Sequence, residues 1–230
     1  MPVESPPVIF SPDDHSYVWE PTGQASRWSV SSVCNTKTPA EVAAIERYRH
    51  VWEPRGTHVH LCLENFLKGK SVDPGDYNEF VEPLLALPFW NDFVLVAAEH
   101  RMMDLKRAVG GTLDAIGYWQ DQLVLLDLKT GSAPRWYSTN RQLGAYLCMF
   151  NQHHGLMVQN CTTIWAFPGK AFHGDWRKAG NGQGRKFYPD GKYWIGDVSS
   201  NSVVEKDVDI EKYDDLTQKK VRYGRNPDLH

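Results

Sequence analysis

The sequence has few cysteines, no long apolar run and no large excess of charge of either sign. No two of its four cysteines stand at the CxxC spacing typical of zinc and redox sites: Cys34, Cys62, Cys148 and Cys161. We therefore expect neither a disulfide framework nor a structural zinc, and we expect a reducing compartment, the cytoplasm. No run approaches the roughly 18 apolar residues of a transmembrane helix, so we expect no membrane partner.

The charge balance is modest, because 25 basic and 28 acidic residues give a net charge of −3. This excludes a polycationic nucleic-acid coat, so contact with a nucleic acid would need a local basic surface or a bound metal. The first seven residues lack the basic-then-apolar pattern of a signal peptide, so we expect no secretory leader. With 230 residues, 41% of them hydrophobic, the chain can form a sizeable core, and disorder is excluded as its main state.

The order of the expected elements predicts an α/β (α+β) fold with a mixed central sheet flanked by helices. Helices are expected, with Pro54 ending the first of them, at 39–51, 55–68, 74–87 and 138–151. Strands are expected at 8–10, 15–19, 28–30, 93–99, 112–119, 123–129 and 162–167. We expect a single domain over residues 1–230, with a core at about 8–167 and an extension at 168–230.

The two strands around Gln120-Asp121 carry the strongest chemical signal. If these residues form a two-residue turn, antiparallel pairing places Asp114 opposite Asp127, with their Cβ atoms about 5 Å apart on one face. Lys129 lies on that face too, because side chains alternate along a strand. Opposed carboxylates repel each other unless a cation lies between them, so Mg²⁺ or Mn²⁺ is expected there. Removal of either carboxylate should then maintain or raise the melting temperature of the metal-free protein.

A simpler interpretation is an ordinary strand-end ion pair between Asp127 and Lys129, with Asp114 in a surface turn. The tripeptide itself is weak evidence, because Asp-x-Lys occurs three times, at 104–106, 127–129 and 190–192. Only the middle copy ends a strongly apolar strand and faces a second carboxylate. A three-residue loop would break this register.

Two further pairs of polar side chains are spaced four residues apart, which places each pair on one helix face. His60 and Glu64 precede the strands, and an imidazole can join carboxylates around a metal. Nothing local distinguishes His60 from His58 as the ligand. Gln142 and Tyr146 follow the strands. Ordinary surface pairs and a polar helix flank are the alternative interpretations.

The segment from Lys170 to Trp194 is both basic and aromatic, with six cations against two carboxylates. Cations neutralise phosphates and aromatic rings stack on unpaired bases, so this segment favours a single-stranded nucleic acid. Its candidate DNA-binding residues are Trp176, Arg177, Lys178, Arg185, Lys186 and Trp194. The alternative is a solvated β-hairpin whose aromatic side chains pack on the core.

Five motifs follow one another in order: Gly56-Thr57-x-x-His60-x-x-x-Glu64, Glu99, Gly111-Thr112-x-Asp114, Asp127-x-Lys129-Thr130-Gly131 and Gln142-x-x-x-Tyr146. This set resembles the PD-(D/E)XK nuclease superfamily, RecB-like branch, close to the mitochondrial genome-maintenance exonuclease and its phage-encoded relatives. His15-x-Tyr17 and residues 29–33 resemble the N-terminal pattern of the phage members. Leu113, rather than proline, precedes Asp114, which departs from the superfamily's name. The resemblance implies a restriction-endonuclease-like core.

The resemblance also implies roles for single residues. The implied metal ligands are His60, Asp114, Asp127 and the Leu128 carbonyl, with Glu64 and Glu99 supporting a second metal. Lys129 would orient or activate the attacking water and offset charge in the transition state. Gln142 and Tyr146 would lie beside the scissile strand.

The implied function is a metal-dependent DNA exonuclease that hydrolyses phosphodiester bonds at single-stranded or frayed ends, in DNA repair or recombination. A helicase or recombinase would be its partner, in the host-cell cytoplasm if the protein is phage-encoded. An iron–sulfur cluster is not expected, because only Cys148 and Cys161 lie where related proteins cluster three cysteines. A structure- or sequence-selective endonuclease and a non-cleaving DNA-binding recombination accessory module are the alternatives.

Overall fold

The computed structural model describes residues 3–12, 14–34, 39–131, 136–155 and 160–175. An N-terminal antiparallel sheet contains three short strands, β1 (Val8–Ser11), β2 (Ser16–Trp19) and β3 (Gln24–Ala25). The ring of Tyr17 packs so closely on Gly110 of the larger sheet that a Cβ there would lie 2.4 Å from it. This contact joins the two sheets, and it requires glycine at position 110.

The larger sheet has six strands: β4 (Trp28–Ser29), β5 (Phe93–Asp104), β6 (Val109–Trp119), β7 (Gln122–Thr130), β8 (Asn160–Phe167) and β9 (Lys170–Asp175). Strand β4 pairs parallel to β6, and β7 pairs parallel to β8, whereas the other neighbours are antiparallel. Helix α5 (Trp136–His154) connects β7 to β8, since parallel neighbours need a crossover. The expected α+β fold with a mixed sheet is confirmed.

The remaining helices precede β5 and comprise α1 (Val30–Cys34), α2 (Pro39–Arg47), α3 (Arg49–Leu67), η1 (Gly75–Tyr77), α4 (Asn78–Leu85) and η2 (Pro88–Asn91). The expected helix boundary at Pro54 is wrong, because this proline lies inside α3 and the break falls at Tyr48. Pro54 removes a single backbone hydrogen bond near the start of the helix. The burial of Val59, Cys62 and Leu63 further along α3 outweighs that loss. Val30, expected at a strand end, instead begins α1.

The turn between β6 and β7 has the expected two-residue length, with Trp119 paired to Gln122. Gln120 and Asp121 both adopt left-handed backbone angles, with φ of 50° and 61°. Positive φ at both central residues is typical of a type I′ turn, whose twist matches that of the two hairpin strands. Gln-Asp is not a residue pair that favours this turn. The predicted hairpin register is therefore confirmed over its paired residues.

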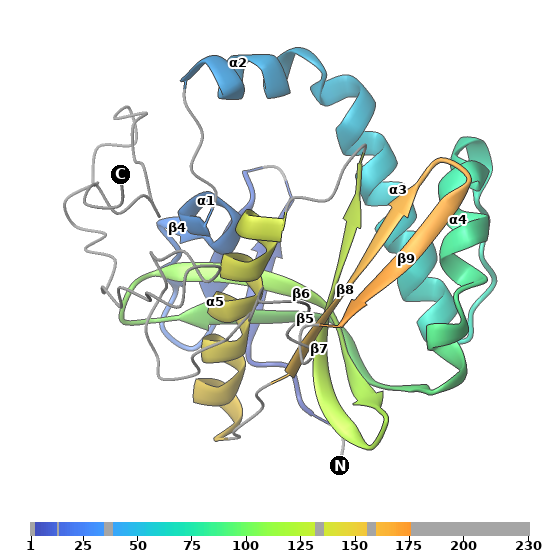
Figure 1. Cartoon of the computed structure of the whole chain (residues 1–230). Helices are drawn as coiled ribbons and strands as arrows, with labels where there is room; N and C mark the ends of the chain where they lie inside the picture. The colour runs from blue at the N-terminus through green and yellow to red at the C-terminus, as the bar shows by residue number, and fades with distance from the viewer. Residues whose placement is uncertain (1–2, 13, 35–38, 132–135, 156–159, 176–230) are drawn as a thin grey trace, which may run out of the picture.

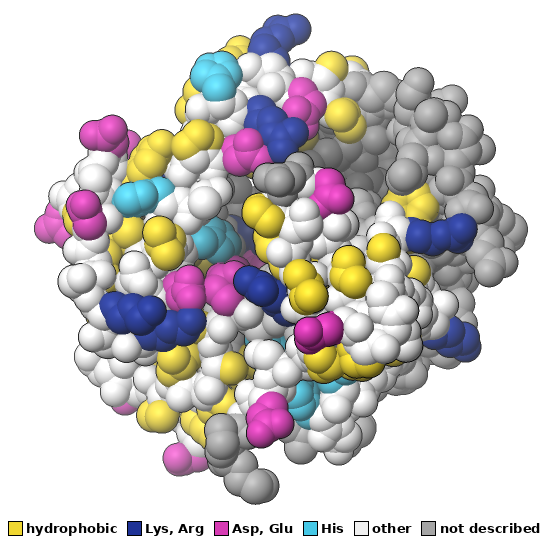
Figure 2. Space-filling model, turned by 180° about the vertical axis from the view of Figure 1, so that it is seen from behind, with side chains coloured by type: hydrophobic (Ala, Val, Ile, Leu, Met, Phe, Trp, Pro, Cys, Tyr) yellow, Lys and Arg dark blue, Asp and Glu magenta, His cyan; other side chains and the backbone are white. Residues whose placement is uncertain are grey.

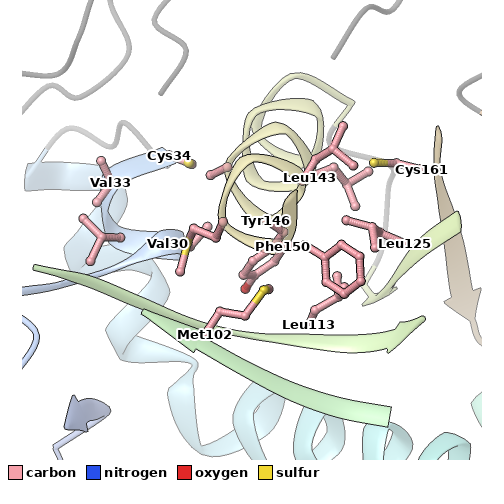
Figure 3. Close-up of a cluster of buried hydrophobic side chains, with 14 of the residues drawn as sticks. Val30, Val33, Cys34, Met102, Leu113, Leu125, Leu143, Tyr146, Phe150 and Cys161 are labelled. Atoms are coloured by element: carbon pink, nitrogen blue, oxygen red, sulfur yellow. The ribbon is translucent and has the colours of Figure 1, made fainter. Parts of the chain in front are cut away.

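Helices cover both faces of the larger sheet (Figure 1). Helices α1 and α5 pack on one face, where Leu143 and Phe150 are fully buried against Leu113 and Leu125 of the strands (Figure 3). Helices α3 and α4 pack on the other face. Strand β7 is apolar on both sides because both of its faces are covered.

Strands β4 and β7 share one edge of β6. Strand β4 pairs with Val109 and Gly110, and β7 pairs with residues 115–119. Between these two partners, residues 111–114 pair with no described strand on that edge, while β5 pairs along the other edge. The candidate site lies at this interruption.

No helix in the described ranges is long and apolar enough to cross a membrane. Of the basic and aromatic segment, β9 is described, and there Phe172 stacks on Trp165 and Phe167 with ring centres 5.2 and 5.5 Å apart. Phe172 therefore packs on the core, as the alternative interpretation of this segment expected. Six candidate DNA-binding residues lie outside the described residues: Trp176, Arg177, Lys178, Arg185, Lys186 and Trp194.

Candidate metal centre

Successive turns of α3 face successive strands of the sheet. Gly56 lies against the end of β7, and His60 contacts Asp114 of β6. One turn further, Glu64 is near enough to Glu99 of β5 for its charge to raise the pKa of Glu99. Four helical residues advance about 6 Å, close to the roughly 4.8 Å between neighbouring strands. The four-residue spacing of the first motif thus follows from a helix that crosses the strands.

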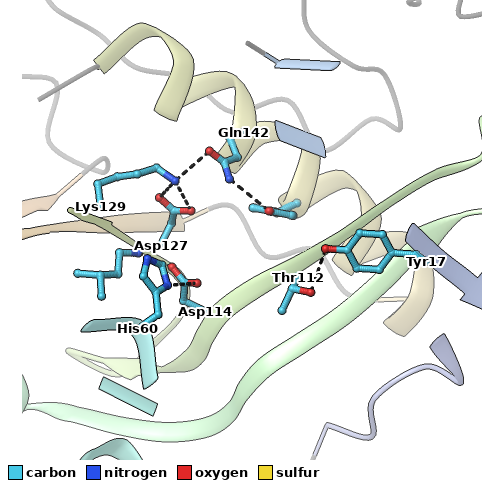
Figure 4. Close-up of polar contacts among 9 residues, drawn as sticks. Tyr17, His60, Thr112, Asp114, Asp127, Lys129 and Gln142 are labelled. Atoms are coloured by element: carbon cyan, nitrogen blue, oxygen red, sulfur yellow. Dashed lines mark hydrogen bonds and ion pairs between the residues drawn. The ribbon is translucent and has the colours of Figure 1, made fainter. Parts of the chain in front are cut away.

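Asp114 lies one residue beyond the last pair of the β6–β7 ladder, Ala115 and Leu126. Beyond this pair, the Asp114 carboxylate accepts a hydrogen bond from the β7 backbone in place of a backbone carbonyl of β6. Oδ2 accepts a hydrogen bond from the Leu128 backbone N–H, and Oδ1 lies 3.0 Å from His60 Nδ1 (Figure 4). Leu128 therefore contacts the site through its N–H, whereas the resemblance implied a role for its carbonyl.

Glu99 lies across from Asp114 on the other edge of β6, between the paired residues 98/115 and 100/113. Its φ of 52° is unusual for a residue other than glycine, and above all within a strand. One ligand atom from each of His60, Glu99 and Asp114 can be chosen such that all lie within 4.8 Å of one another. These three residues form the candidate metal centre.

Burial and neighbouring charges act differently on the acidic groups. Burial and the charge of Asp114 raise the pKa of Glu99 to about 7. Burial alone would also raise the pKa of Asp114, but the adjacent His60 and hydrogen bonds hold it below its ordinary value. Burial lowers the pKa of His60, yet the Asp114 carboxylate more than compensates and raises it. Asp114 is thus stabilised as an anion, and Glu99 is not.

A chain of polar contacts runs from the sheet into α5 (Figure 4). Lys129 Nζ lies 2.9 Å from Asp127 Oδ1 and donates to Gln142 Oε1, also at 2.9 Å. Gln142 Nε2 in turn donates to the Tyr146 hydroxyl at 3.2 Å. Tyr146 packs on Gly111, where a Cβ would lie 2.7 Å from its ring. The Lys129 ammonium is therefore held by Asp127 of its own strand and by Gln142 of α5.

Asp127 is held by Lys129 and is not one of the three residues that form the candidate metal centre. Burial raises the pKa of Asp127 to about 6, with Asp114 adding to the rise and Lys129 opposing it. Its Oδ2 is buried and accepts no hydrogen bond from the described residues, although Lys129 Nζ lies 2.7 Å away. A buried acceptor with spare capacity beside an imidazole and two carboxylates fits a hard divalent cation such as Mg²⁺ or Mn²⁺.

The structure separates other candidates from this centre. His58 Nε2 lies 2.9 Å from the Asp73 carbonyl and its ring packs near Tyr77, so His60 is the histidine beside the carboxylates. Glu64 pairs with Lys68, the residue that directly follows α3. Sequence reasoning missed the hydrogen bond between the Tyr17 and Thr112 hydroxyls, although His15-x-Tyr17 and Gly111-Thr112-x-Asp114 are both motifs of the sequence. Acidic, histidine and basic side chains gather around a hollow on one face of the molecule (Figure 2).

Comparisons with known proteins identify no family. No family model matches the chain, and no curated protein matches it. A solved structure described as "Crystal structure of SSO0001" matches with 14% sequence identity and a TM-score of 0.35. The match covers 64% of this chain and 65% of the length of that one. A likeness of this degree leaves the function to be argued from the site.

Proposed function

We propose that this protein is a metal-dependent deoxyribonuclease that hydrolyses phosphodiester bonds, acting as an exonuclease on single-stranded or frayed DNA ends. The observation that carries the proposal is the approach of His60, Glu99 and Asp114 within 4.8 Å, beside the ion pair of Asp127 and Lys129. Hard donors next to a fixed ammonium suit phosphoryl transfer, in which negative charge builds up on oxygen. The order of the motifs, which resembles the PD-(D/E)XK superfamily, supports the same function.

A purely structural ion-pair network accounts less well for the geometry. Glu99 has a raised pKa of about 7 and a left-handed backbone, and both features disfavour the metal-free folded state. Asp127 is likewise poorly stabilised as an anion. Unfavourable features gathered at one place are typical of a functional site.

A divalent cation at this centre would supply positive charge that polarises a phosphoryl group. The residues of the chain do the positioning. Asp127 and Gln142 hold the Lys129 ammonium, which offsets negative charge on a bound phosphate. Tyr146 supports Gln142 from the core, so the ammonium needs little reorganisation when a substrate binds.

The test compares end-labelled linear DNA with closed single-stranded circles, in Mg²⁺ and in EDTA, with the Asp127→Asn variant as the control. We expect the wild type to degrade linear DNA in Mg²⁺ and to leave closed circles intact. Neither the wild type in EDTA nor Asp127→Asn should degrade linear DNA. Rapid nicking of circles would favour an endonuclease, and binding without cleavage would favour an accessory module. Cleavage in EDTA would contradict the metal mechanism. The proposal also includes a helicase or recombinase partner and a cytoplasmic location.

A further inference from the structure

Arg55 is a half-buried cation that no carboxylate neutralises among the described residues. It lies in α3, five residues before His60. Its guanidinium carbon lies 5.1 Å from the centre of the Phe80 ring in α4. Its Nε is buried and donates to no acceptor in the described part of the chain. Burial without a hydrogen-bond partner is unfavourable, so this arrangement needs an explanation.

Two other arginines of the described ranges, Arg49 and Arg107, contact carboxylates. Arg49, in the same helix, lies 2.8 Å from Glu53 and 3.4 Å from Glu46. Arg107 lies 3.1 Å from Asp104. Arg101 also lies over a ring, that of Phe10 at 5.8 Å, but it is exposed to solvent. Arg55 differs because it is half-buried against an aromatic face. A cation over a ring gains only about 0.5–2 kcal/mol, which leaves the cation free to bind an anion.

The location of Arg55 connects this cation to the candidate metal centre. The neighbouring Gly56 lies against Thr130, whose Oγ1 would be 3.7 Å from a Cβ, and Thr130 follows Lys129. Five helical residues place Arg55 about 7.5 Å from His60 along the helix axis. Arg55 is thus at the Lys129 end of the centre, about 1.4 helical turns before His60, which contacts Asp114.

We infer that Arg55 binds a phosphate of the nucleic-acid strand next to the phosphate at the metal centre, and thereby positions the strand. The inference rests on the proposed function. A guanidinium presents a planar set of donors that matches phosphate oxygens, which an ammonium does not. The Phe80 ring holds this group in one orientation, so less side-chain freedom is lost when the strand binds.

The experiment measures the affinity of a fluorescent single-stranded oligonucleotide over a range of KCl concentrations, in EDTA so that the strand stays intact. We expect Arg55→Met to weaken binding about tenfold or more, because a charged hydrogen bond is lost. The slope of log affinity against log salt should become shallower by about 0.7, the value for one phosphate contact on a single strand. Arg49→Met is the matched control, because it removes the same charge from the same helix and should leave the slope unchanged.

A slope equal to that of the wild type in Arg55→Met would overturn the inference, whatever the melting temperature of the variant. Should Arg55→Met fail to fold, Arg55→Gln carries the same test. Arg55→Lys, which keeps the charge, should retain the slope and lose part of the affinity. If the wild type binds no DNA, both the proposed function and this inference are contradicted. If the wild type binds and cleaves DNA, an unchanged slope in Arg55→Met contradicts this inference and leaves the proposed function intact.

Discussion

Glu99 combines two features that disfavour the metal-free folded state at a single residue. Its φ of 52° costs of the order of 1–3 kcal/mol for a side chain with a Cβ. Its carboxylate, with a pKa of about 7, is poorly stabilised as an anion. A bound cation would favour the ionised form, so the residue is better suited to binding than to stability.

The raised pKa of Glu99 predicts a dependence of stability on pH in the absence of metal. A carboxyl group whose pKa rises from about 4.5 to about 7 on folding contributes stability below pH 4.5 and loses it as the pH rises through 7. Relative to Glu99→Gln, the melting temperature of the wild type should therefore fall by a few °C from pH 5 to pH 8. The measurement is thermal unfolding of both proteins in EDTA.

Buried His100, with a pKa lowered to about 4, has the opposite dependence below pH 6.5, but it is common to both proteins and cancels in the difference. Parallel curves for the wild type and Glu99→Gln would contradict the prediction. Glu99→Gly separates the two features, because it removes the backbone strain as well as the charge. It should be more stable than Glu99→Gln.

Asp114→Asn and Asp127→Asn should both abolish cleavage, yet only Asp114→Asn should lower the stability of the metal-free protein. At pH 8 the Asp127 anion is unfavourable, with a pKa of about 6, so the amide should maintain or raise the melting temperature. The Asp114 anion is favoured by His60 and the Leu128 N–H, so the amide should lower it. For Asp114 this differs from the expectation, based on repulsion alone, that removing either carboxylate maintains or raises the melting temperature. Asp121→Asn in the exposed turn is the control, and shifts of one sign in both site variants would refute the assignment.

Lys129→Ala should lower kcat by orders of magnitude and change KM little, because its charge matters most in the transition state. Lys106, in an exposed turn, belongs to another Asp-x-Lys sequence and is the control. Lys106→Ala should lower turnover far less, as steady-state kinetics on labelled single strands would show. If Lys106→Ala were inactive and Lys129→Ala active, the assignment of the centre to the hairpin that contains Lys129 would be wrong.

Among the elements, the hairpin and the helix that follows it could be predicted from the sequence because their signals are local. A tight turn fixes the register of β6 and β7, and the apolar stripe of α5 at Leu143, Leu147 and Phe150 is buried as expected. The helix break was misplaced because Pro54 is a strong local signal, whereas the break at Tyr48 has none. Tertiary packing of α3 decided that boundary.

The interruption of the β6 edge could not be predicted, because it depends on contacts between strands distant in the sequence. Pairing rules extended the ladder to Asp114 and Asp127, as if every residue of the hairpin were paired. In the structure β4 takes one part of that edge and β7 another, and the Asp114 carboxylate lies between them. The types of ligand were therefore predictable from the sequence. The different places of the two carboxylates, Asp114 in the candidate metal centre and Asp127 in the ion pair with Lys129, were not.

Gly111→Ala tests how tightly α5 must pack on β6. A Cβ at this position would lie 2.7 Å from the Tyr146 ring and 2.8 Å from Val30, so both must move. We expect a loss of about 1–3 kcal/mol in stability and a fall in kcat, since Tyr146 supports Gln142 and Lys129. Chemical denaturation measures the first and kinetics the second.

Gly56→Ala is the control for this substitution. Its Cβ would lie 3.7 Å from Thr130, an ordinary contact, and alanine favours a helix over glycine by about 0.5–1 kcal/mol. Gly56→Ala should therefore raise the free energy of unfolding. An unchanged stability in Gly111→Ala would show that α5 can shift without consequence.

At the scale of the whole molecule, the basic and aromatic segment predicts a preference for unpaired DNA. Loss of one stacking ring costs about 1–3 kcal/mol per base, so Trp176→Ala or Trp194→Ala should weaken single-strand binding by roughly 5- to 150-fold. Affinity for blunt duplex should fall less. Binding titrations with both substrates would measure the difference. Unchanged single-strand affinity in both variants would contradict base stacking and favour the alternative, in which these rings pack on the core.

The hydrogen bond from the Leu128 backbone to Asp114 links an amide in the middle of the sheet to the charge of the candidate centre. The NMR resonance of such an amide responds to the electrostatic state of its acceptor, because a charge-assisted hydrogen bond changes when the acceptor binds a cation. Leu128 labelled with ¹⁵N would therefore report the arrival of a metal at Asp114 without any substrate. The backbone of β7 carries its own spectroscopic probe of metal occupancy.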